Sequence, residues 1–296
     1  MPVMGRRDTG PMETPHRSDL AGTTALVTGA SSGIGRVTAR ELACRGATVV
    51  LACRSEARTQ PVLAEIARLT GRADAAVWLP LDLADFASVR ACAEGFLRLE
   101  RPLHLLVNNA GLAGARGLTR DGFEMAFGVN HLGHFLLTRC LEDRLITSAP
   151  ARVVTVASRA HRGAGGLDWA ALRRPTRSLT GIREYAASKL ANILFSAALA
   201  RRLAGRGVGA YAVHPGVVDT EVWRTVPGAL RPLLRLRGLL TPEDGARTSL
   251  HCCVDALPGE SGLYFARSSP VTPSRRARDG ALADELWQRS EAWVAS

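Results

Sequence analysis

The chain has 296 residues, 46% of them hydrophobic, which suits one large α/β domain or two smaller ones. Its formal net charge of +11 raises nucleic acid and anionic membranes as partners. We exclude a nucleic-acid groove because the arginines are spread along the chain and are not gathered with aromatic residues. No run approaches the ~18 apolar residues of a membrane span, so we expect no stable membrane insertion.

The cysteines and the N-terminus indicate a reduced, cytoplasmic protein. The six cysteines form no C-x-x-C pair and show no metal-type spacing with histidine, so we predict neither a disulfide framework nor a metal site. Residues 1–19 are rich in Arg, Pro and Met and lack the apolar core of a signal peptide. We predict a disordered tail over residues 1–19 and a folded domain over residues 20–296.

The first predicted unit is a strand, a glycine turn and a helix. The apolar run 23–27 precedes the sequence TGASSGIG at residues 28–35, and a helical segment over 36–45 ends at Gly46, which suits a helix C-cap. The glycines let the backbone turn tightly and approach a pyrophosphate, which a helix N-terminus attracts. This pattern predicts a dinucleotide site.

The second strand ends at a position that selects the nucleotide. Residues 47–53 are predicted as a strand that ends at Arg54, about 20 residues past the glycine loop. An acidic residue there would bind the ribose 2′-hydroxyl of NAD, whereas arginine suits a 2′-phosphate. Arg54 therefore favours NADP(H), with Arg36 assisting. A solvated surface arginine is the alternative in so arginine-rich a chain.

The alternation of strands and helices continues through the next 50 residues or so. The predicted elements are a helix over 55–71 that is broken early by Pro61, a strand over 75–81, a helix over 85–100 and a strand over 103–107. Short strands that alternate with helical segments indicate βαβ units and a parallel sheet. Asp82 follows one of these strands, where its side chain either holds the adenine amino group or caps the next helix.

A long helical stretch is predicted over residues 119–147. It contains Asn130, and an asparagine inside a helix usually has a reason to be there. His131 and His134 are three residues apart on the same stretch. We assign them to packing or hydrogen bonding and not to a metal, because no carboxylate or cysteine ligand accompanies them.

The next strand leads to a candidate catalytic hydroxyl. Residues 152–157 are predicted as a strand that ends at Ser158, and a side chain at the carboxyl end of such a strand lies in the ligand crevice. The segment 159–182 is rich in Gly and Arg and is predicted to be a loop around the substrate.

The stretch YAASK, from Tyr185 to Lys189, opens a helix that is predicted to run to about Gly205. Lys189 is the only lysine among 38 lysines and arginines. Residues four apart share a helix face, so the ammonium stands beside the phenol and favours phenolate. A tyrosine tuned in this way is a general acid/base near neutral pH. The alternative is that the lone lysine fell here by chance.

The last part of the chain completes the sheet and adds a lid. A strand over 208–213 is predicted to run into the sequence HPGVVDT at 214–220. Residues 221–240 are predicted to form a mobile lid over an apolar pocket, and contact of this segment with a membrane surface is the alternative. The remaining predicted elements are a helix that opens at Thr241-Pro242, a strand over 262–266, a flexible segment over 274–278 and a helix over 282–294.

Taken together, these motifs resemble the short-chain dehydrogenase/reductase family over roughly residues 20–270. The glycine loop at 28–35, NNAG at 108–111 and the P-G-x-x-x-T motif at 215–220 carry the resemblance. LACR at 51–54, NHLGHF at 130–135, Ser158 with His161, and HPG at 214–216 resemble the retinol-dehydrogenase-like branch. The resemblance implies a single Rossmann-type, doubly wound α/β domain with a mainly parallel, seven-stranded sheet.

The resemblance also implies the roles of the site residues. The catalytic tetrad of the family maps onto Asn130, Ser158, Tyr185 and Lys189. Tyr185 would transfer the proton and Ser158 would hydrogen-bond the substrate oxygen. Lys189 would lower the pKa of the phenol and hold the nicotinamide ribose, and Asn130 would fix a water that links Lys189 to solvent. The expected cofactor contacts are Gly29, Ser31, Ser32, Gly33, Ile34, Gly35, Arg54, Asp82, Leu83, Asn109, Ala110, Gly111, Tyr185, Lys189, Pro215, Gly216, Val218 and Thr220.

The predicted function is that of an NADP(H)-dependent oxidoreductase, with NAD(H) as the alternative cofactor, that acts on lipophilic alcohols, aldehydes or ketones. A non-enzymatic NADP sensor or scaffold is the competing hypothesis, although such relatives tend to lose the Tyr and Lys that this chain keeps. We expect no N-terminal membrane anchor of the kind that the branch carries. Subunits of the family often pair through the two long helices near Asn130 and Tyr185, so a homo-oligomer is a further expectation.

Overall fold

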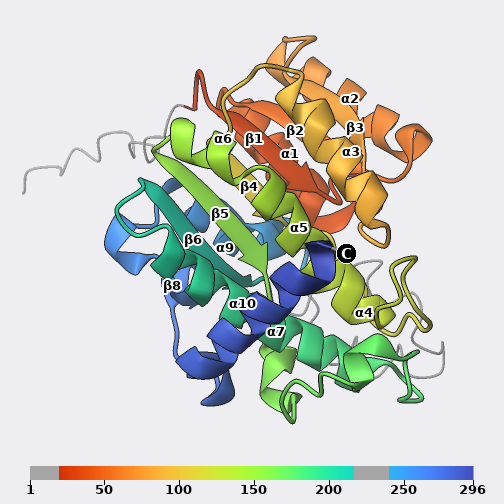
Figure 1. Cartoon of the computed structure of the whole chain (residues 1–296). Coiled ribbons are helices and arrows are strands. Elements are labelled where there is room, and N and C mark those ends of the chain that lie inside the picture. Colours follow the sequence, from red (N-terminus) through yellow and green to blue (C-terminus); the bar gives the residue numbers. More distant parts are fainter. Residues whose placement is uncertain (1–19, 217–239, 296) are drawn as a thin grey trace, which may run out of the picture.

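The fold follows the predicted alternation of strands and helices (Figure 1). The structure is a computed structural model that describes residues 20–216 and 240–295; the predicted tail over 1–19 and all of the predicted lid except Leu240 lie outside these residues. The strands are β1 (Thr24–Thr28), β2 (Thr48–Cys53), β3 (Ala76–Pro80), β4 (Leu105–Asn108), β5 (Ala151–Val156), β6 (Val208–His214), β7 (Tyr264–Ala266) and β8 (Ser269–Pro270). The helices of the described residues are α1 (Gly33–Cys44), α2 (Glu56–Thr70), α3 (Phe86–Leu97), α4 (Met125–Phe127), α5 (Gly133–Cys140), α6 (Glu142–Thr147), α7 (Ile182–Arg202), α9 (Pro242–Val254) and α10 (Gly280–Ala295).

All eight strands of the described residues form one sheet. Its strand order is β3-β2-β1-β4-β5-β6-β7-β8; β1 to β7 pair in parallel and β8 pairs antiparallel with β7. The prediction of a doubly wound domain with a mainly parallel sheet is confirmed, and all seven predicted strands are present. The eighth strand escaped prediction because it has only two residues, both exposed, and so leaves no periodic pattern.

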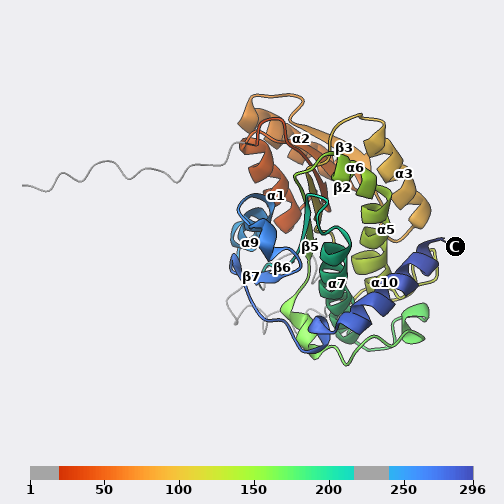
Figure 2. The same cartoon turned by 60° about the vertical axis from the view of Figure 1, so that its left-hand side comes forward.

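Helices cover both faces of the sheet (Figure 2). On one face, α1, α2 and α9 bury an apolar cluster that includes Leu42, Ile66 and Cys252. On the other face, α3, α5, α7 and α10 bury a second cluster that includes Phe96 and Leu194. The order of the strands reverses between β1 and β4, and in such sheets ligands bind outside the carboxyl ends of the strands at this point.

Two helix predictions are wrong. Pro61 does not break α2. The only backbone hydrogen bond that a proline loses inside a helix is the one to the carbonyl four residues earlier. That carbonyl belongs to Ala57, an exposed residue in the first turn of the helix, where water can satisfy it. The long helix predicted over 119–147 is divided: it begins only at α4, and a π-helical turn at Gly128–Leu132 separates α4 from α5.

The structure also bears on three predictions for the last part of the chain. Thr241 caps α9 by accepting a hydrogen bond from the Asp244 amide at 3.1 Å, with Pro242 in the first turn, as predicted. The segment predicted to be flexible contains a 3-10 turn at Arg276–Arg278. Helix α10 packs against α7, one of the two helices near which subunit pairing is predicted, and that pairing stays a prediction (Figure 2).

Candidate active site

A cavity of about 810 Å³ lies at the carboxyl ends of the central strands. Each strand from β1 to β6 contributes residues at or just past its carboxyl end: Gly29, Arg54, Asp82, Asn109, Ser158 and Pro215. This is the place at which an open parallel sheet binds its ligand.

Most of the predicted site residues line the cavity. The predicted residues that line it are Gly29, Ser31, Ser32, Gly33, Ile34, Gly35, Arg54, Asp82, Leu83, Asn109, Ala110, Gly111, Ser158, Tyr185, Lys189, Pro215 and Gly216. Asn130 is not among the lining residues. Val218 and Thr220 lie outside the described residues.

The glycine loop is held tightly against the turn that follows β4. Gly29 has a φ of +67°, and a Cβ on Gly35 would lie 2.4 Å from Asn109 Nδ2. The Thr28 hydroxyl accepts hydrogen bonds from the amides of Asn109 and Ala110 at 2.9 and 3.0 Å. The first turn of α1 contains no acidic residue and receives no side-chain capping hydrogen bond, and Gly33, Ile34 and Gly35 line the cavity. A helix N-terminus of this kind suits a phosphate.

Two arginines next to β2 line the end of the cavity at which the sequence predicts the adenosine of a dinucleotide. Arg54 is exposed and lines the wall, as predicted. Arg58, which the sequence reasoning missed, also lines it from the first turn of α2, after the helix is capped by Ser55. Its place in the cavity could have been predicted, because Arg58 is a basic residue about one helical turn beyond Arg54. Asp82 lines the cavity, but it does not cap α3, because Asp85 accepts the hydrogen bonds from that helix.

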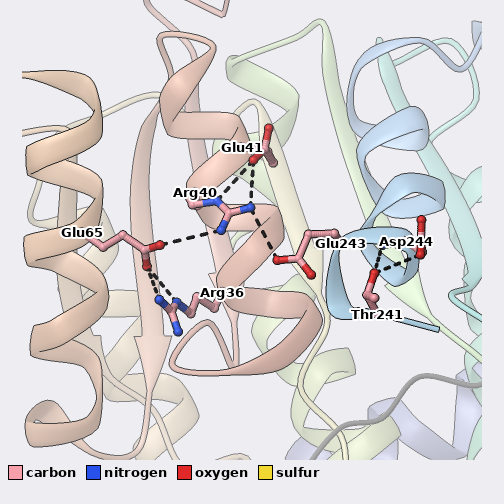
Figure 3. Close-up of polar contacts among 7 residues, drawn as sticks. All are labelled: Arg36, Arg40, Glu41, Glu65, Thr241, Glu243 and Asp244. Atoms are coloured by element: carbon pink, nitrogen blue, oxygen red, sulfur yellow. Dashed lines mark hydrogen bonds and ion pairs between the residues drawn. The ribbon is translucent and has the colours of Figure 1, made fainter. Parts of the chain in front are cut away.

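Arg36 is not at the predicted position (Figure 3). Its guanidinium pairs with Glu65 of α2 at 2.7 Å, and it is absent from the lining of the cavity. Glu65 also lies 3.7 Å from Arg40, which in turn lies 3.8 Å from Glu243 at the start of α9. These charges therefore join α1 to both neighbouring helices, and the assisting role predicted for Arg36 stays a prediction.

Tyr185, Ser158 and Lys189 meet in the cavity wall. The Tyr185 side chain is buried and hydrogen-bonded to the side chain of Ser158, while Lys189 Nζ lies 5.7 Å from the centre of the phenol ring. Lys189 donates to the carbonyl of Val156 at 2.7 Å. The helix therefore presents phenol and ammonium on one face, as the spacing predicts.

The pKa values of this pair differ from the prediction. Burial raises the pKa of the Tyr185 phenol above its ordinary value, and the hydrogen bond with Ser158 opposes that rise only in part. Burial also lowers the pKa of Lys189 to about 7. Burial therefore outweighs the predicted lowering of the phenol pKa by the Lys189 ammonium.

Asn130 holds backbone segments around the cavity. It lies in the π-helical turn and is fully buried. Its Oδ1 accepts from the Leu112 amide at 2.9 Å, and its Nδ2 donates to the Leu112 carbonyl at 3.0 Å and to Ser188 Oγ at 2.9 Å. These bonds join the turn after β4 to α7 beside Lys189. The water that Asn130 was predicted to fix stays a prediction.

His134 connects this asparagine to the glycine loop. Its Nδ1 lies 3.0 Å from the Asn130 carbonyl, which can only accept, so Nδ1 carries the proton. Nε2 then accepts from the Thr28 hydroxyl at 2.8 Å. Burial lowers the pKa of His134 to about 4, which keeps the ring neutral, and the bond to the Asn130 carbonyl fixes the tautomer.

The second histidine of that stretch joins α10 to the core. His131 Nε2 lies 3.0 Å from Ser290 Oγ, and its ring packs against the rings of Phe127 and Phe195. The predicted packing and hydrogen-bonding roles of both histidines are confirmed by these contacts. Within the described ranges no group of three or more His, Cys, Asp or Glu side chains could hold a metal ion.

A third histidine holds Ser158 from the other side. His161 is buried, and its Nδ1 donates to the Ser158 carbonyl at 2.7 Å. Its Nε2 accepts from the Ser274 amide at 3.0 Å, and its ring packs edge-on against Tyr264. Arg162 adds a hydrogen bond to the Thr272 carbonyl at 2.7 Å. The segment that precedes α10 is thereby tied to the turn that carries Ser158.

Comparison with known proteins agrees with this geometry. The sequence matches the family described as short chain dehydrogenase over residues 23–172 and 173–229. It is 47% identical over 279 residues to dehydrogenase/reductase SDR family member 13 of Bos taurus, covering 92% of this chain and 73% of the relative. It is 46% identical over 275 residues to human retinol dehydrogenase 12, covering 92% of this chain and 86% of the relative.

Solved structures share the fold. A crystal structure of an uncharacterized protein from Mycobacterium paratuberculosis is 36% identical, with a TM-score of 0.76, and covers 94% of this chain and 95% of its own. A structure from Beutenbergia cavernae, described as an NAD(P) dependent gluconate 5-dehydrogenase with bound NADP, is 30% identical with a TM-score of 0.68. That match covers 85% of this chain and 97% of the other. Among the residues that the structure describes, no helix has the length and apolar character of a membrane span.

Proposed function

The chain belongs to the short-chain dehydrogenase family and is an oxidoreductase of alcohol and carbonyl groups, and on this premise we propose that it is NADP(H)-dependent and acts on a lipophilic small molecule. One observation carries the proposal: a buried phenol, hydrogen-bonded to a serine and one turn from the only lysine, stands in the wall of a cavity whose other end carries two arginines.

The residues at the adenosine end fit NADP(H). The uncapped first turn of α1 suits the pyrophosphate, and Arg54 and Arg58 suit a 2′-phosphate through charge-assisted hydrogen bonds. Within the lining, Asp82 is the one acidic side chain, and it follows β3, so no lining carboxylate of the described residues follows β2 to select NAD. The nicotinamide, when bound, supplies or accepts the hydride.

The residues of the wall provide the acid/base chemistry. Tyr185 is placed to donate a proton to the substrate oxygen in reduction and to remove it in oxidation. Its raised pKa keeps it protonated at neutral pH, which suits the reductive direction. The Ser158 hydroxyl donates a hydrogen bond to the same oxygen and stabilises the negative charge that develops there. Tyr185 and Lys189 are buried in the wall of the cavity, where electrostatic interactions are stronger than in water.

The remaining lining favours an apolar substrate body. The side chains of Leu112, Ala113, Met125 and Val129 line the cavity from the turn after β4 and from α4 with the π-helical turn that follows it. Apolar walls of this kind bind a ligand mainly by burying its apolar surface. We therefore propose aliphatic aldehydes, ketones and alcohols as the substrate class, a choice in keeping with the relative named retinol dehydrogenase 12.

Replacement of Arg54 tests the cofactor assignment. We expect Arg54→Ala to weaken NADPH binding by roughly 10- to 100-fold, because hydrogen bonds to a charged group contribute about 1.5–3 kcal/mol. The Kd for NADH should change little, since NADH has no 2′-phosphate. Fluorescence titration with each cofactor measures both constants. Arg68→Ala, an exposed arginine of α2 that does not line the cavity, is the matched control.

The same titration of the wild type decides between the cofactors. Tighter binding of NADPH than of NADH supports the assignment. A preference for NADH would make Arg54 a surface residue and remove the basis for NADP(H). If neither cofactor bound, the dinucleotide site itself would be refuted.

The contact between His161 and Ser158 predicts a positioning effect. His161→Phe keeps an aromatic ring against Tyr264 but removes both hydrogen bonds, so Ser158 loses its support. We expect kcat to fall roughly 10- to 100-fold, as small displacements of catalytic groups do, with an unchanged Kd for NADPH. His251→Phe, which likewise replaces an imidazole that packs against an aromatic ring by a phenyl ring, should leave kcat unchanged. Equal loss in both variants would indicate general destabilisation.

A further inference from the structure

The side chains that line the cavity carry more positive than negative charge. Four of its residues are arginines, namely Arg54, Arg58, Arg116 and Arg159, whereas Asp82 is its one carboxylate among the described residues. Two of the arginines are accounted for by the 2′-phosphate of the proposed cofactor. The other two follow β4 and β5, and Arg159 stands directly after Ser158 in the sequence.

The strand order separates these charges. Arg159 follows β5, Arg54 follows β2 and Asp82 follows β3 in a sheet ordered β3-β2-β1-β4-β5. With strands about 4.8 Å apart, Arg159 begins about 14 Å from Arg54 and about 19 Å from Asp82. Distances of this size exceed the screening length of about 8 Å at physiological salt. Neither the 2′-phosphate nor Asp82 therefore neutralises Arg159.

Arg159 also differs from the arginines around it. Arg116 donates to the carbonyls of Leu179 and Thr176 at 3.2 and 3.5 Å, and Arg162 donates to the Thr272 carbonyl. The guanidinium of Arg159 makes no ion pair or hydrogen bond with any residue in ranges 20–216 and 240–295. Its backbone amide donates to His214 Nδ1 at 3.4 Å. Arg159 is thus an exposed cation on the cavity wall, directly after Ser158.

We propose that Arg159 is an anion-binding residue at the substrate end of the cavity, and that the preferred substrates are apolar carbonyl compounds or alcohols that carry an acidic group. The inference rests on the proposed function and narrows its substrate class. A guanidinium binds a carboxylate through two parallel hydrogen bonds, which a neutral ester cannot accept with the same strength. The apolar side chains of Leu112, Ala113, Met125 and Val129 bind the hydrocarbon part of the same molecule.

A matched pair of substrates tests this assignment. We compare ω-oxodecanoate with its methyl ester, which has the same aldehyde and chain but no charge, under NADPH. The wild type should show a kcat/KM roughly 10-fold or more higher for the acid, and added salt should reduce that ratio. Arg159→Gln should bring the ratio close to one, and Arg159→Lys should retain part of it. Arg183→Gln, an exposed arginine of α7 that does not line the cavity, should keep the wild-type rates and ratio.

Three outcomes would overturn the inference alone. The first is equal use of acid and ester by the wild type, and the second is an unchanged ratio in Arg159→Gln. The third is a weaker Kd for NADPH in Arg159→Gln with equal losses for both substrates, which would assign the residue to the cofactor. If the wild type bound NADPH but reduced neither aldehyde, the proposed function would fail together with the inference.

Discussion

Tyr185→Phe is expected to lower turnover roughly 10²- to 10⁴-fold, the range that a general acid/base contributes, while the Kd for NADPH stays close to the wild-type value. The substitution keeps the buried ring and removes only the hydroxyl that is hydrogen-bonded to Ser158. The loss should therefore appear in kcat and not in cofactor affinity. Steady-state kinetics with an aliphatic aldehyde, together with an NADPH titration, separate the two quantities.

The chain offers a matched control for this change. Tyr211 is also buried, and its hydroxyl donates to the Leu257 carbonyl at 3.2 Å, outside the cavity. Tyr211→Phe removes one hydrogen bond of about 1 kcal/mol and should leave kcat unchanged. Wild-type kcat in Tyr185→Phe would end the assignment of this tyrosine as the proton donor.

Lys189→Met is expected to make the protein more stable and nearly inactive at the same time. The pKa of Lys189 is lowered from its ordinary 10.5 to about 7 by burial, so the folded state holds this charge at a cost. The carbonyl to which Lys189 donates also accepts a hydrogen bond from Asn192 Nδ2 at 3.0 Å, so the substitution does not leave it unpaired. Thermal denaturation should show a Tm several degrees higher than that of the wild type. Turnover should fall roughly 10²-fold, because the family resemblance assigns Lys189 to hold the nicotinamide ribose and misplacement of a reacting group costs a factor of this size.

The stability difference should depend on pH in a defined direction. Below pH 7 the lysine is charged in both the folded and the unfolded state, and the full burial penalty is present. As the pH rises from 7 towards 10.5, the folded state releases the proton while the unfolded state keeps it, and the penalty declines to zero. The gain in stability of Lys189→Met should therefore be largest at or below pH 7 and vanish near pH 10.5. A gain that is independent of pH would contradict the burial of a charged lysine.

The sequence allowed the cofactor side of the site to be predicted because its signals are local. The glycines at 29, 33 and 35, the strand that ends at Arg54, and the four-residue spacing of Tyr185 and Lys189 each determine their own geometry through backbone freedom or helix periodicity. The structure places all of them on one cavity. The parallel strand order followed from the same local alternation.

The features that escaped prediction depend on partners distant in the sequence. Nothing near Arg36 shows that Glu65, 29 residues away, would take its charge. The bond between His161 and Ser274 spans 113 residues, and that between His134 and Thr28 spans 106. The lowered pKa of Lys189 likewise arises from burial by the whole fold, which the sequence near the lysine does not reveal.

The proposed function makes a single central claim, namely that this cavity brings a carbonyl carbon and a nicotinamide together for hydride transfer. Its most direct test supplies NADPH that carries deuterium on the reactive face of C4, together with decanal, and analyses the alcohol by mass spectrometry. We predict one deuterium at the carbinol carbon, formed by the wild type and roughly 10²- to 10⁴-fold more slowly by Tyr185→Phe. Bound NADPH with no label in the product, for decanal and for longer aldehydes and ketones alike, would contradict the claim and would favour a protein that senses the cofactor without using it.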